Sequence, residues 1–185
     1  MKIVAIDFET ANPNPLSACA LGLAIFQDQE LVEAPYWLIK PPKGHGWFIE
    51  EWTQEIHGIS WRDVRDQPEF SGIAKQVLQH LASADLVVAH NAPFDLRVLN
   101  ALLAHCGRTP PPFEHTCTLQ LARQTWPYLP NHQLSTLAAH IGCELNHHHA
   151  QSDAIAAGRV MLKLKESREC AINPVLVQST THHVS

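Results

Sequence analysis

The spacing of hydrophobic and polar residues changes part-way along the chain. Three apolar runs come first, rich in the residues that favour β-strands: Lys2–Phe8, Ala18–Phe26 and Glu30–Lys40. A short polar turn, QDQE, separates the second run from the third, so we predict an antiparallel meander of three strands. Pro35 cannot donate a ladder hydrogen bond, and we expect it at a bulge or on an edge strand.

Later segments repeat their apolar residues every three or four positions, as helices do. The Pro- and Gly-rich segment 41–52 predicts a loop before them. The pattern then predicts helices over Phe70–Leu81, Ala92–Cys106, Leu119–Trp126, Leu134–Ile141 and Ala150–Leu164, and strands over Leu86–Ala89 and Phe113–Cys117. A meander followed by alternating helices and strands predicts an α/β fold, in which helices flank one mixed sheet.

Composition and length narrow the class of protein. The chain has 185 residues, of which 45% are hydrophobic and 17% are charged, as in ordinary globular proteins. We place a single domain at residues 1–168 and a tail at 169–185. The tail shows no periodic pattern, which fits either a disordered segment or one laid over the surface. No apolar run is long enough to span a membrane.

Charge and cysteine content bear on partners and location. The net charge of −5 argues against a broad basic surface for nucleic acid, although bound cations would still allow a nucleic-acid substrate. Five cysteines without CxxC spacing are typical of reduced, mostly buried thiols. No signal-peptide pattern stands at the start of the sequence, so we expect a cytoplasmic protein.

Two carboxylates follow the first apolar run. Asp7 and Glu9 are two residues apart on a predicted strand, so their side chains project from the same face. Two like charges held this close raise each other's pKa, and a divalent cation would relieve the repulsion. A solvated strand end is the alternative explanation for this pair alone.

Two further acidic residues lie where helices are expected to begin. Asp95 follows a buried strand in VVAHNAPFD, and Asp153 follows His147, His148 and His149. Either aspartate alone is explained by the favourable position of a carboxylate at a helix N-terminus. Together with Asp7 and Glu9, they predict acidic groups that converge on one metal site.

Three motifs carry a resemblance to a known family. DFET, HNAPFD and HHAQSDA, in this order, closely resemble the motifs of the DnaQ-like 3′–5′ exonucleases that have an active-site histidine. IHGIS, CTLQLAR and HQLSTLAAHIG are lesser matches, and the resemblance covers roughly residues 2–165. It implies a ribonuclease H-like fold, with parallel strands added to the antiparallel meander. The motif residues are those discussed above, with one departure: Ala11 and Asn12 stand where many relatives have Thr-Gly after the first-motif threonine.

The resemblance assigns roles to individual residues. Asp7, Glu9, Asp95 and Asp153 correspond to the metal ligands of the family, and His148 to its general base. Spacing alone would also allow His149, which stands four residues before Asp153 and would share its helix face. His148 can join the site only from a loop that precedes the helix. The triple histidine suits zinc as well, but no cysteine or further histidine pair stands at a supporting spacing.

The chemistry expected of this site is phosphodiester hydrolysis. Two Mg²⁺ or Mn²⁺ ions can stabilise the attacking and leaving oxygens while a histidine takes a proton from water. We therefore predict a 3′–5′ exonuclease that acts on single-stranded DNA and releases nucleoside 5′-monophosphates. The alternatives are an exoribonuclease that acts on RNA or short oligoribonucleotides, and a non-catalytic nucleic-acid-binding module associated with a polymerase. The second is disfavoured because every catalytic-type position is filled.

Substrate contacts follow from motif position. We expect Thr10, His57, Asn91 and Phe94 to meet the terminal nucleotide, and Ile59 to wedge between bases. Phe94 as a core residue, Asn91 as a turn former and Ile59 as a loop anchor are the competing explanations. The loop aromatic residues Trp47, Phe48 and Trp52 fit either stacking on a strand or sealing the core.

Overall fold

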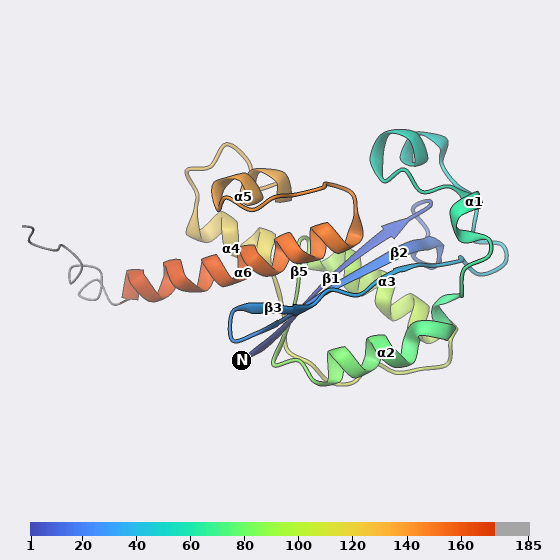
Figure 1. The fold of residues 1–185 in the computed structure, drawn as a ribbon, viewed down its shortest axis with the longest axis horizontal. Coiled ribbons are helices and arrows are strands. Elements are labelled where there is room, and N and C mark those ends of the chain that lie inside the picture. The colour runs from blue at the N-terminus through green and yellow to red at the C-terminus, as the bar shows by residue number, and fades with distance from the viewer. Residues whose placement is uncertain (173–185) are drawn as a thin grey trace, which may run out of the picture.

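One mixed sheet forms the centre of the molecule (Figure 1). The computed structural model describes residues 1–172, in which the sheet has the strand order β3-β2-β1-β5-β6, with β4 also paired to β2. The strands are β1 (Lys2–Thr10), β2 (Ala18–Gln27), β3 (Glu30–Glu33), β4 (Tyr36–Leu38), β5 (Leu86–Ala89) and β6 (His115–Cys117). β1, β2 and β3 pair antiparallel, whereas β5 and β6 add parallel strands beyond β1. The predicted α/β fold with a meander and parallel strands is confirmed.

The predicted third strand is divided into two. β3 and β4 both pair with β2, and the residues between them, Ala34 and Pro35, belong to neither strand. The Pro35 carbonyl still accepts a hydrogen bond from the Leu23 N–H at 2.9 Å, so the chain stays beside β2. Both short strands lie at the edge of the sheet, which confirms the edge position expected of Pro35.

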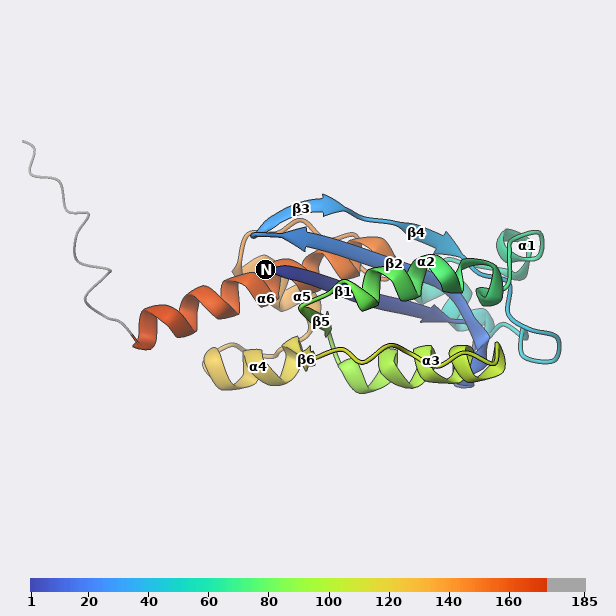
Figure 2. The ribbon, with the colours of Figure 1, turned by 90° about the horizontal axis from the view of Figure 1, so that it is seen from below.

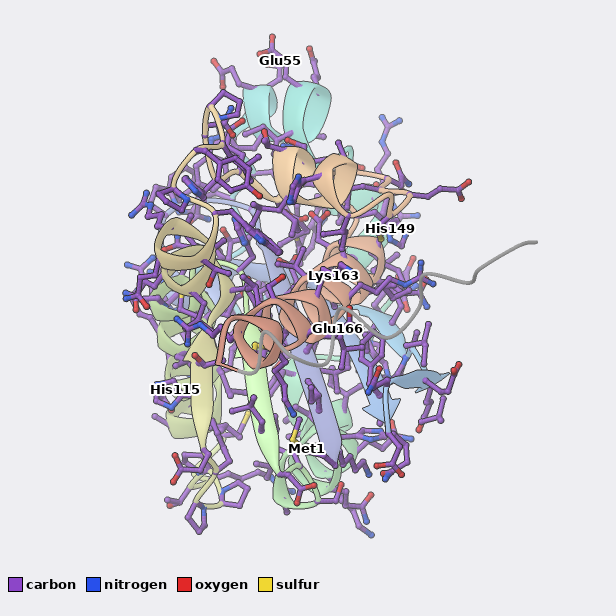
Figure 3. The ribbon with its side chains drawn as sticks, turned by 90° about the vertical axis from the view of Figure 1, so that its left-hand side faces the viewer. Met1, Glu55, His115, His149, Lys163 and Glu166 are labelled. Carbon is purple, nitrogen blue, oxygen red and sulfur yellow. The ribbon has the colours of Figure 1, made fainter. Side chains whose placement is uncertain are left out.

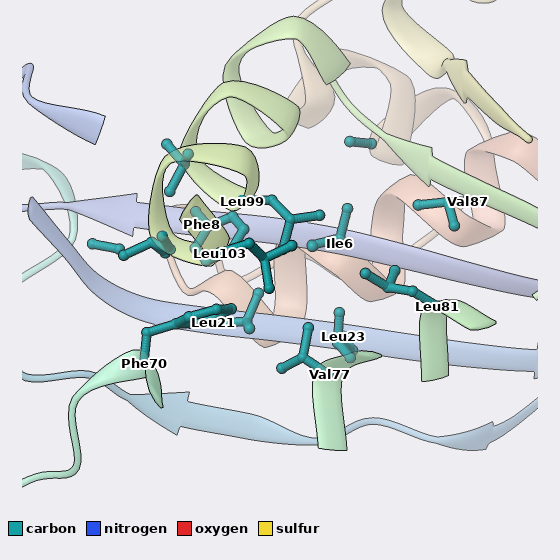
Figure 4. Close-up of a cluster of buried hydrophobic side chains, with 14 of the residues drawn as sticks. Ile6, Phe8, Leu21, Leu23, Phe70, Val77, Leu81, Val87, Leu99 and Leu103 are labelled. Carbon is teal, nitrogen blue, oxygen red and sulfur yellow. The ribbon is translucent and has the colours of Figure 1, made fainter. Parts of the chain in front are cut away.

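The two faces of β1 are covered by different helices (Figure 2). Val4, Ile6 and Phe8 point into a core that they share with α2 (Phe70–Ala82) and α3 (Ala92–His105) (Figure 4). Ile3 and Ala5 point the other way, against α6 (Ala150–Ile172). Because side chains alternate along a strand, Asp7 and Glu9 continue the second row and lie on the α6 side.

The helices largely match the predicted ones, with shifted ends. The remaining helical elements are η1 (Pro15–Ser17), η2 (Trp52–Ile56), α1 (Trp61–Val64), α4 (Thr118–Thr125) and α5 (Leu134–His140). The predicted loop 41–52 is wrong at its end, since the chain becomes helical at Glu50 and continues into the π-helical turn η2. α6 continues beyond the predicted domain boundary at 168, to Ile172, and the rest of the predicted tail lies outside the described residues.

Two glycines allow α6 to approach the sheet closely. A Cβ added at Gly22 of β2 would lie 2.2 Å from the Ala150 carbonyl oxygen, in the first turn of α6. At Gly158, farther along α6, a Cβ would lie 2.2 Å from the ring of Phe26. Gly22 pairs with Asp7 across the β1–β2 ladder. The close approach therefore brings the start of α6 over the strand position that carries the first carboxylate.

The cysteines that the structure describes are free thiols, as expected, but only some of them are fully buried. Cys19 and Cys117 are buried free thiols, whereas Cys106 and Cys143 are half-buried free thiols; Cys170 falls where side chains are not described. Within the described part of the chain, no helix combines the length and apolar character that a bilayer span requires.

Candidate active site

A cleft of about 770 Å³ opens at the C-terminal end of β1. β1 contributes residues 7–10 to its lining, and η2 and the start of α3 contribute others. The opposite wall comes from α4 and the segment before α5, and the loop that precedes α6 completes the cleft. Figure 3 shows that Glu55, on η2, and Met1, at the start of the chain, lie toward opposite ends of the molecule in that view.

Three of the predicted ligands come together in this cleft. Asp7 and Glu9 from β1 and Asp153 from α6 each offer a carboxylate oxygen, and these oxygens lie within 4.8 Å of one another. Burial raises the pKa of all three groups, and mutual repulsion adds to the effect for Asp7 and Glu9. The pKa of Glu9 rises to about 8. Three ionised carboxylates this close together repel one another, and a hard cation bound between them would neutralise their charge.

Asp95 lies beside these carboxylates but faces the protein. It is fully buried in the first turn of α3, and its Oδ1 accepts a hydrogen bond of 3.0 Å from the Phe8 N–H of β1. Burial raises its pKa to about 8, and Asp153 repels its charge. In this arrangement Asp95 does not line the cleft, and its carboxylate is outside the group of three oxygens.

His148 lies on the loop before α6, as the resemblance required. Its backbone is left-handed, with φ at 62°, and its N–H donates to Asp153 Oδ2 at 2.9 Å. The imidazole lines the cleft, and burial together with the neighbouring His147 lowers its pKa, against the opposing effect of Asp153. His149 turns away and stacks on Tyr36, with ring centroids 4.6 Å apart. Figure 3 shows His149 at the N-terminal end of α6, away from Lys163 and Glu166.

All four predicted substrate-binding residues line the cleft: Thr10, His57, Asn91 and Phe94. His57 accepts a hydrogen bond from the Ile59 N–H at Nδ1, so its Nε2 carries the proton. The His57 ring is half-buried beside the Thr10 backbone, and burial lowers its pKa. Phe94 also packs against the main core, so its competing core explanation holds as well.

Ile59, which we expected to wedge between bases, does not line the cleft. Its side chain is 9% exposed and packs in a small core with Val64 and Ala150. The π-helical turn η2 places Ile56 on the cleft instead, with 41% of that residue exposed. The pattern of the sequence alone did not show this turn.

The three loop aromatic residues separate from one another. Trp52 lines the cleft, Phe48 packs against the core around Ile59, and Trp47 is 57% exposed. Asn12 holds this loop, since its Nδ2 donates to the carbonyl oxygens of His45 at 3.1 Å and Trp47 at 2.7 Å. The departure from Thr-Gly in the first motif therefore has a structural consequence: Asn12 is fully buried and anchors the loop.

The opposite wall of the cleft was not among the predicted site residues. It includes Arg123, His132, Gln133 and Ser135, with His90 at its base. His90 Nδ1 lies 3.1 Å from Thr118 Oγ1, and burial lowers the pKa of His90 to about 4. The segments CTLQLAR and HQLSTLAAHIG supply much of this wall, so the lesser matches in the sequence were the available signal.

A mixed sheet with buried carboxylates at the end of its first strand defines a class of α/β proteins with a candidate metal-binding active site. Comparison with known proteins makes the assignment specific. Residues 4–161 match the RNase_T exonuclease family, and the chain belongs to that family. The predicted exonuclease resemblance and ribonuclease H-like fold are thereby confirmed.

Relatives and solved structures agree with this assignment. The chain is similar to the 3′-5′ exonuclease DinG of Bacillus subtilis, with 30% identity over 96% of this chain and 19% of DinG. It is 36% identical to a PolC-type DNA polymerase III of Oceanobacillus iheyensis over 63% of this chain and 8% of the polymerase. The chain thus spans about a fifth or less of these relatives.

Two solved structures share the fold. Exonuclease X, in complex with 5′ overhanging duplex DNA, superposes with a TM-score of 0.68 and 23% identity, covering 90% of this chain and 93% of that one. Exonuclease I superposes with a TM-score of 0.76 and 18% identity, covering 95% of this chain and 43% of that one.

Proposed function

We propose that this chain is a metal-dependent exonuclease that degrades single-stranded DNA from its 3′ end and releases nucleoside 5′-monophosphates. The observation that carries the proposal is the convergence of Asp7, Glu9 and Asp153, from a strand and a helix, beside His148 in one open cleft. Family membership supports the reaction class. The similarity to DinG, a 3′-5′ exonuclease, supports the direction of degradation.

The donor set fits hard divalent cations. Three carboxylate oxygens lie within 4.8 Å of one another, and no described ion pair joins them to a lysine or arginine. We assign Asp7, Glu9 and Asp153 to two Mg²⁺ or Mn²⁺ ions, and Asp95 as a further ligand that must turn from the Phe8 N–H toward the cleft when the ions bind. When bound, such ions neutralise charge on the carboxylates and the scissile phosphate and favour ionisation of water. A bound cation favours the ionised carboxylates, so it offsets the effect of burial on their pKa values.

His148 is assigned as the general base. A base must be unprotonated at the working pH, and burial lowers the pKa of this imidazole from its usual range near neutrality. Within residues 1–172, the hydrogen bond described for His148 uses its backbone N–H, so a ring nitrogen can accept the proton of the attacking water. The hydrogen bond from its backbone N–H to Asp153 fixes the base relative to a metal ligand.

The substrate assignment rests on the cleft lining and on the solved neighbours. Thr10, His57, Asn91 and Phe94 surround the carboxylates, and the half-buried Phe94 ring offers a face on which a base can stack. The neighbouring structures are complexes with DNA: a 5′ overhanging duplex for Exonuclease X and a dT13 oligonucleotide for Exonuclease I. These complexes favour DNA over RNA.

The test is one gel series with 5′-labelled single-stranded DNA, duplex DNA and RNA of one sequence. With Mg²⁺ or Mn²⁺ we expect a descending ladder on single-stranded DNA, mononucleotide 5′-phosphates as products, and no reaction in excess EDTA. Asp7→Asn is the matched inactive control. Faster degradation of RNA would move the substrate to the exoribonuclease alternative. Full activity in EDTA, or release of mononucleotides from the 5′ end, would contradict the proposal.

A further inference from the structure

The cleft contains a second set of candidate metal ligands, which overlaps the carboxylate group at one residue. His147, His148 and Asp153 each offer one ligand atom, and these atoms lie within 4.8 Å of one another. His147 Nδ1 is 3.5 Å from Asp153 Oδ1. The rings of His147 and His148 stack with centroids 3.8 Å apart and an interplanar angle of 22°. His147 therefore points a ring nitrogen at the carboxylate while the His148 ring lies flat against the His147 ring, and the two rings must turn apart for their in-plane lone pairs to meet on one ion.

The donor atoms of this set differ from those of the carboxylate group. Two imidazole nitrogens and one carboxylate oxygen suit a borderline cation such as Zn²⁺, whereas Mg²⁺ prefers oxygen ligands throughout. Tetrahedral zinc has bonds of about 2.0–2.2 Å, which place neighbouring ligand atoms roughly 3.3 Å apart. The separation of His147 and Asp153 is already close to that value. A fourth position stays open to the cleft.

Local structure holds two of the three ligands and leaves the third able to adjust. The hydrogen bond from the His148 backbone N–H ties His148 to Asp153, and Asp153 itself is 4% exposed. The His147 side chain is 42% exposed, so its ring can rotate to close the remaining distance. His149 is excluded because its ring stacks on Tyr36. His147 and His148 are thus the two candidate ligands, whereas His149 packs against Tyr36.

We propose that His147, His148 and Asp153 form a zinc-binding site whose occupation inhibits the enzyme. Zinc at this position uses the lone pair of His148, which then cannot accept a proton from water. It also draws Asp153 away from the Mg²⁺ or Mn²⁺ ligands. The inhibitory half of this inference rests on the proposed function, whereas zinc binding itself does not.

Zinc binding is tested without any nuclease assay. The full chain, free of other metals, competes for Zn²⁺ with a chromophoric chelator, and circular dichroism checks that each variant is folded. We expect His147→Ala to weaken zinc binding at least about 10-fold, the lower end of the loss seen when even outer partners of metal ligands are removed. Equal affinity in His147→Ala and the parent would overturn the site.

Two matched controls keep the result specific. His149→Ala removes the neighbouring histidine that stacks on Tyr36, and a double variant of His182 and His183 to alanine removes the chain's other adjacent histidine pair. Both should bind zinc as the parent does. Loss of binding in the double variant, with His147→Ala unaffected, would place the zinc elsewhere and contradict the inference.

Inhibition is tested at saturating Mg²⁺, with each rate normalised to the zinc-free rate of the same variant. We expect Zn²⁺ to inhibit the parent and to require at least about 10-fold more metal for His147→Ala. Equal sensitivity would show that zinc inhibits through the carboxylates alone, which overturns the inhibitory half. A parent that binds zinc but lacks nuclease activity would contradict the proposed function, and the binding site would stand.

Discussion

At the scale of single residues, three consecutive histidines have three different environments. The His148 ring lines the cleft with a backbone bond to Asp153, His147 approaches the same carboxylate from its exposed side, and His149 packs on Tyr36. A difference of one position along the chain therefore separates a candidate base from a packing residue. The left-handed backbone at His148 makes this possible, because it reverses the chain immediately before α6.

The first prediction separates these histidines by rate. His148→Ala should lower kcat by on the order of 10²–10⁴, the usual contribution of a positioned general base. His147→Ala and His149→Ala should lose much less in Mg²⁺. Single-turnover rates on single-stranded DNA measure the effect, and far-ultraviolet circular dichroism controls for folding. Loss of nuclease activity in His149→Ala, together with normal activity in His148→Ala, would mean that our assignment of the third motif is shifted by one residue.

A second prediction concerns the pH dependence of stability at His90. Burial lowers the pKa of His90 to about 4; a hydrogen bond with the His132 backbone opposes this effect, and electrostatic repulsion from His147, Arg123 and His132 adds to it. A depressed histidine pKa favours the neutral folded form above about pH 6.5, and this contribution is lost as the pH falls toward 4. The loss should reach on the order of 2–3 kcal/mol.

His90→Asn tests this prediction, because an asparagine amide can replace the hydrogen bond to Thr118. Urea unfolding of parent and variant at a series of pH values gives the two stability curves. We expect the free energy of unfolding of the parent, measured relative to that of His90→Asn, to fall between about pH 6.5 and 4. Parallel curves for the two proteins would show that His90 is not the group responsible.

At the scale of elements, the contact between α6 and the sheet decides where Asp153 lies. A Cβ at Gly22 would meet backbone atoms of Ala150 and Gln151 at 2.2–2.4 Å. Backbone cannot rotate away as a side chain can, so the first turn of α6 must shift. At Gly158 the added Cβ would meet the Phe26 ring instead, farther along the helix.

The third prediction compares these two glycines. Gly22→Ala and Gly158→Ala should each destabilise the protein by roughly 1–3 kcal/mol, the usual cost of overpacking. Only Gly22→Ala should also lower kcat strongly at temperatures well below the melting point, because it displaces Asp153 from Asp7 and Glu9. Thermal melts and nuclease rates on the same samples provide the comparison. Equal kcat in both variants would mean that the start of α6 tolerates the shift.

At the scale of the whole molecule, we expect the buried carboxylates to couple folding to cation binding. The pKa of Glu9 and the pKa of Asp95 each rise to about 8, chiefly through burial. A raised carboxyl pKa means that the folded protein binds protons more tightly than the unfolded chain does. Without cations, this contribution to stability is fully present below about pH 4 and is lost as the pH rises through about 8.

The fourth prediction follows from this sign. In EDTA, the melting temperature should fall between about pH 5 and 8, and added Mg²⁺ should raise it more at pH 8 than at pH 5. Asp7→Asn should melt at or above the parent in EDTA and lose most of the gain from Mg²⁺. Asp66→Asn, which changes an exposed carboxylate paired with Arg65, is the matched control. A large fall in melting temperature for cation-free Asp7→Asn would make that carboxylate structural.

The sequence by itself determined the features that depend on local pattern. Alternation along β1 and helical spacing in α2 and α3 record which side chains are buried, so the strands and most helices could be predicted. The resemblance of the three motifs to the family pointed to the carboxylates and His148, and the structure places Asp7, Glu9, Asp153 and His148 in one cleft. Element ends were less certain, as in the extension of α6 to Ile172.

The tertiary structure alone decided the features that depend on contacts between distant segments. Edge pairing with β2 divided the predicted third strand, and the π-helical turn put Ile56 rather than Ile59 on the cleft. Asp95 faces the Phe8 N–H, and His147 approaches Asp153, only because α3 and α6 dock against the end of β1. Periodicity reports whether a side chain is buried, but the position of the partner that buries or binds it is set by packing across the sheet.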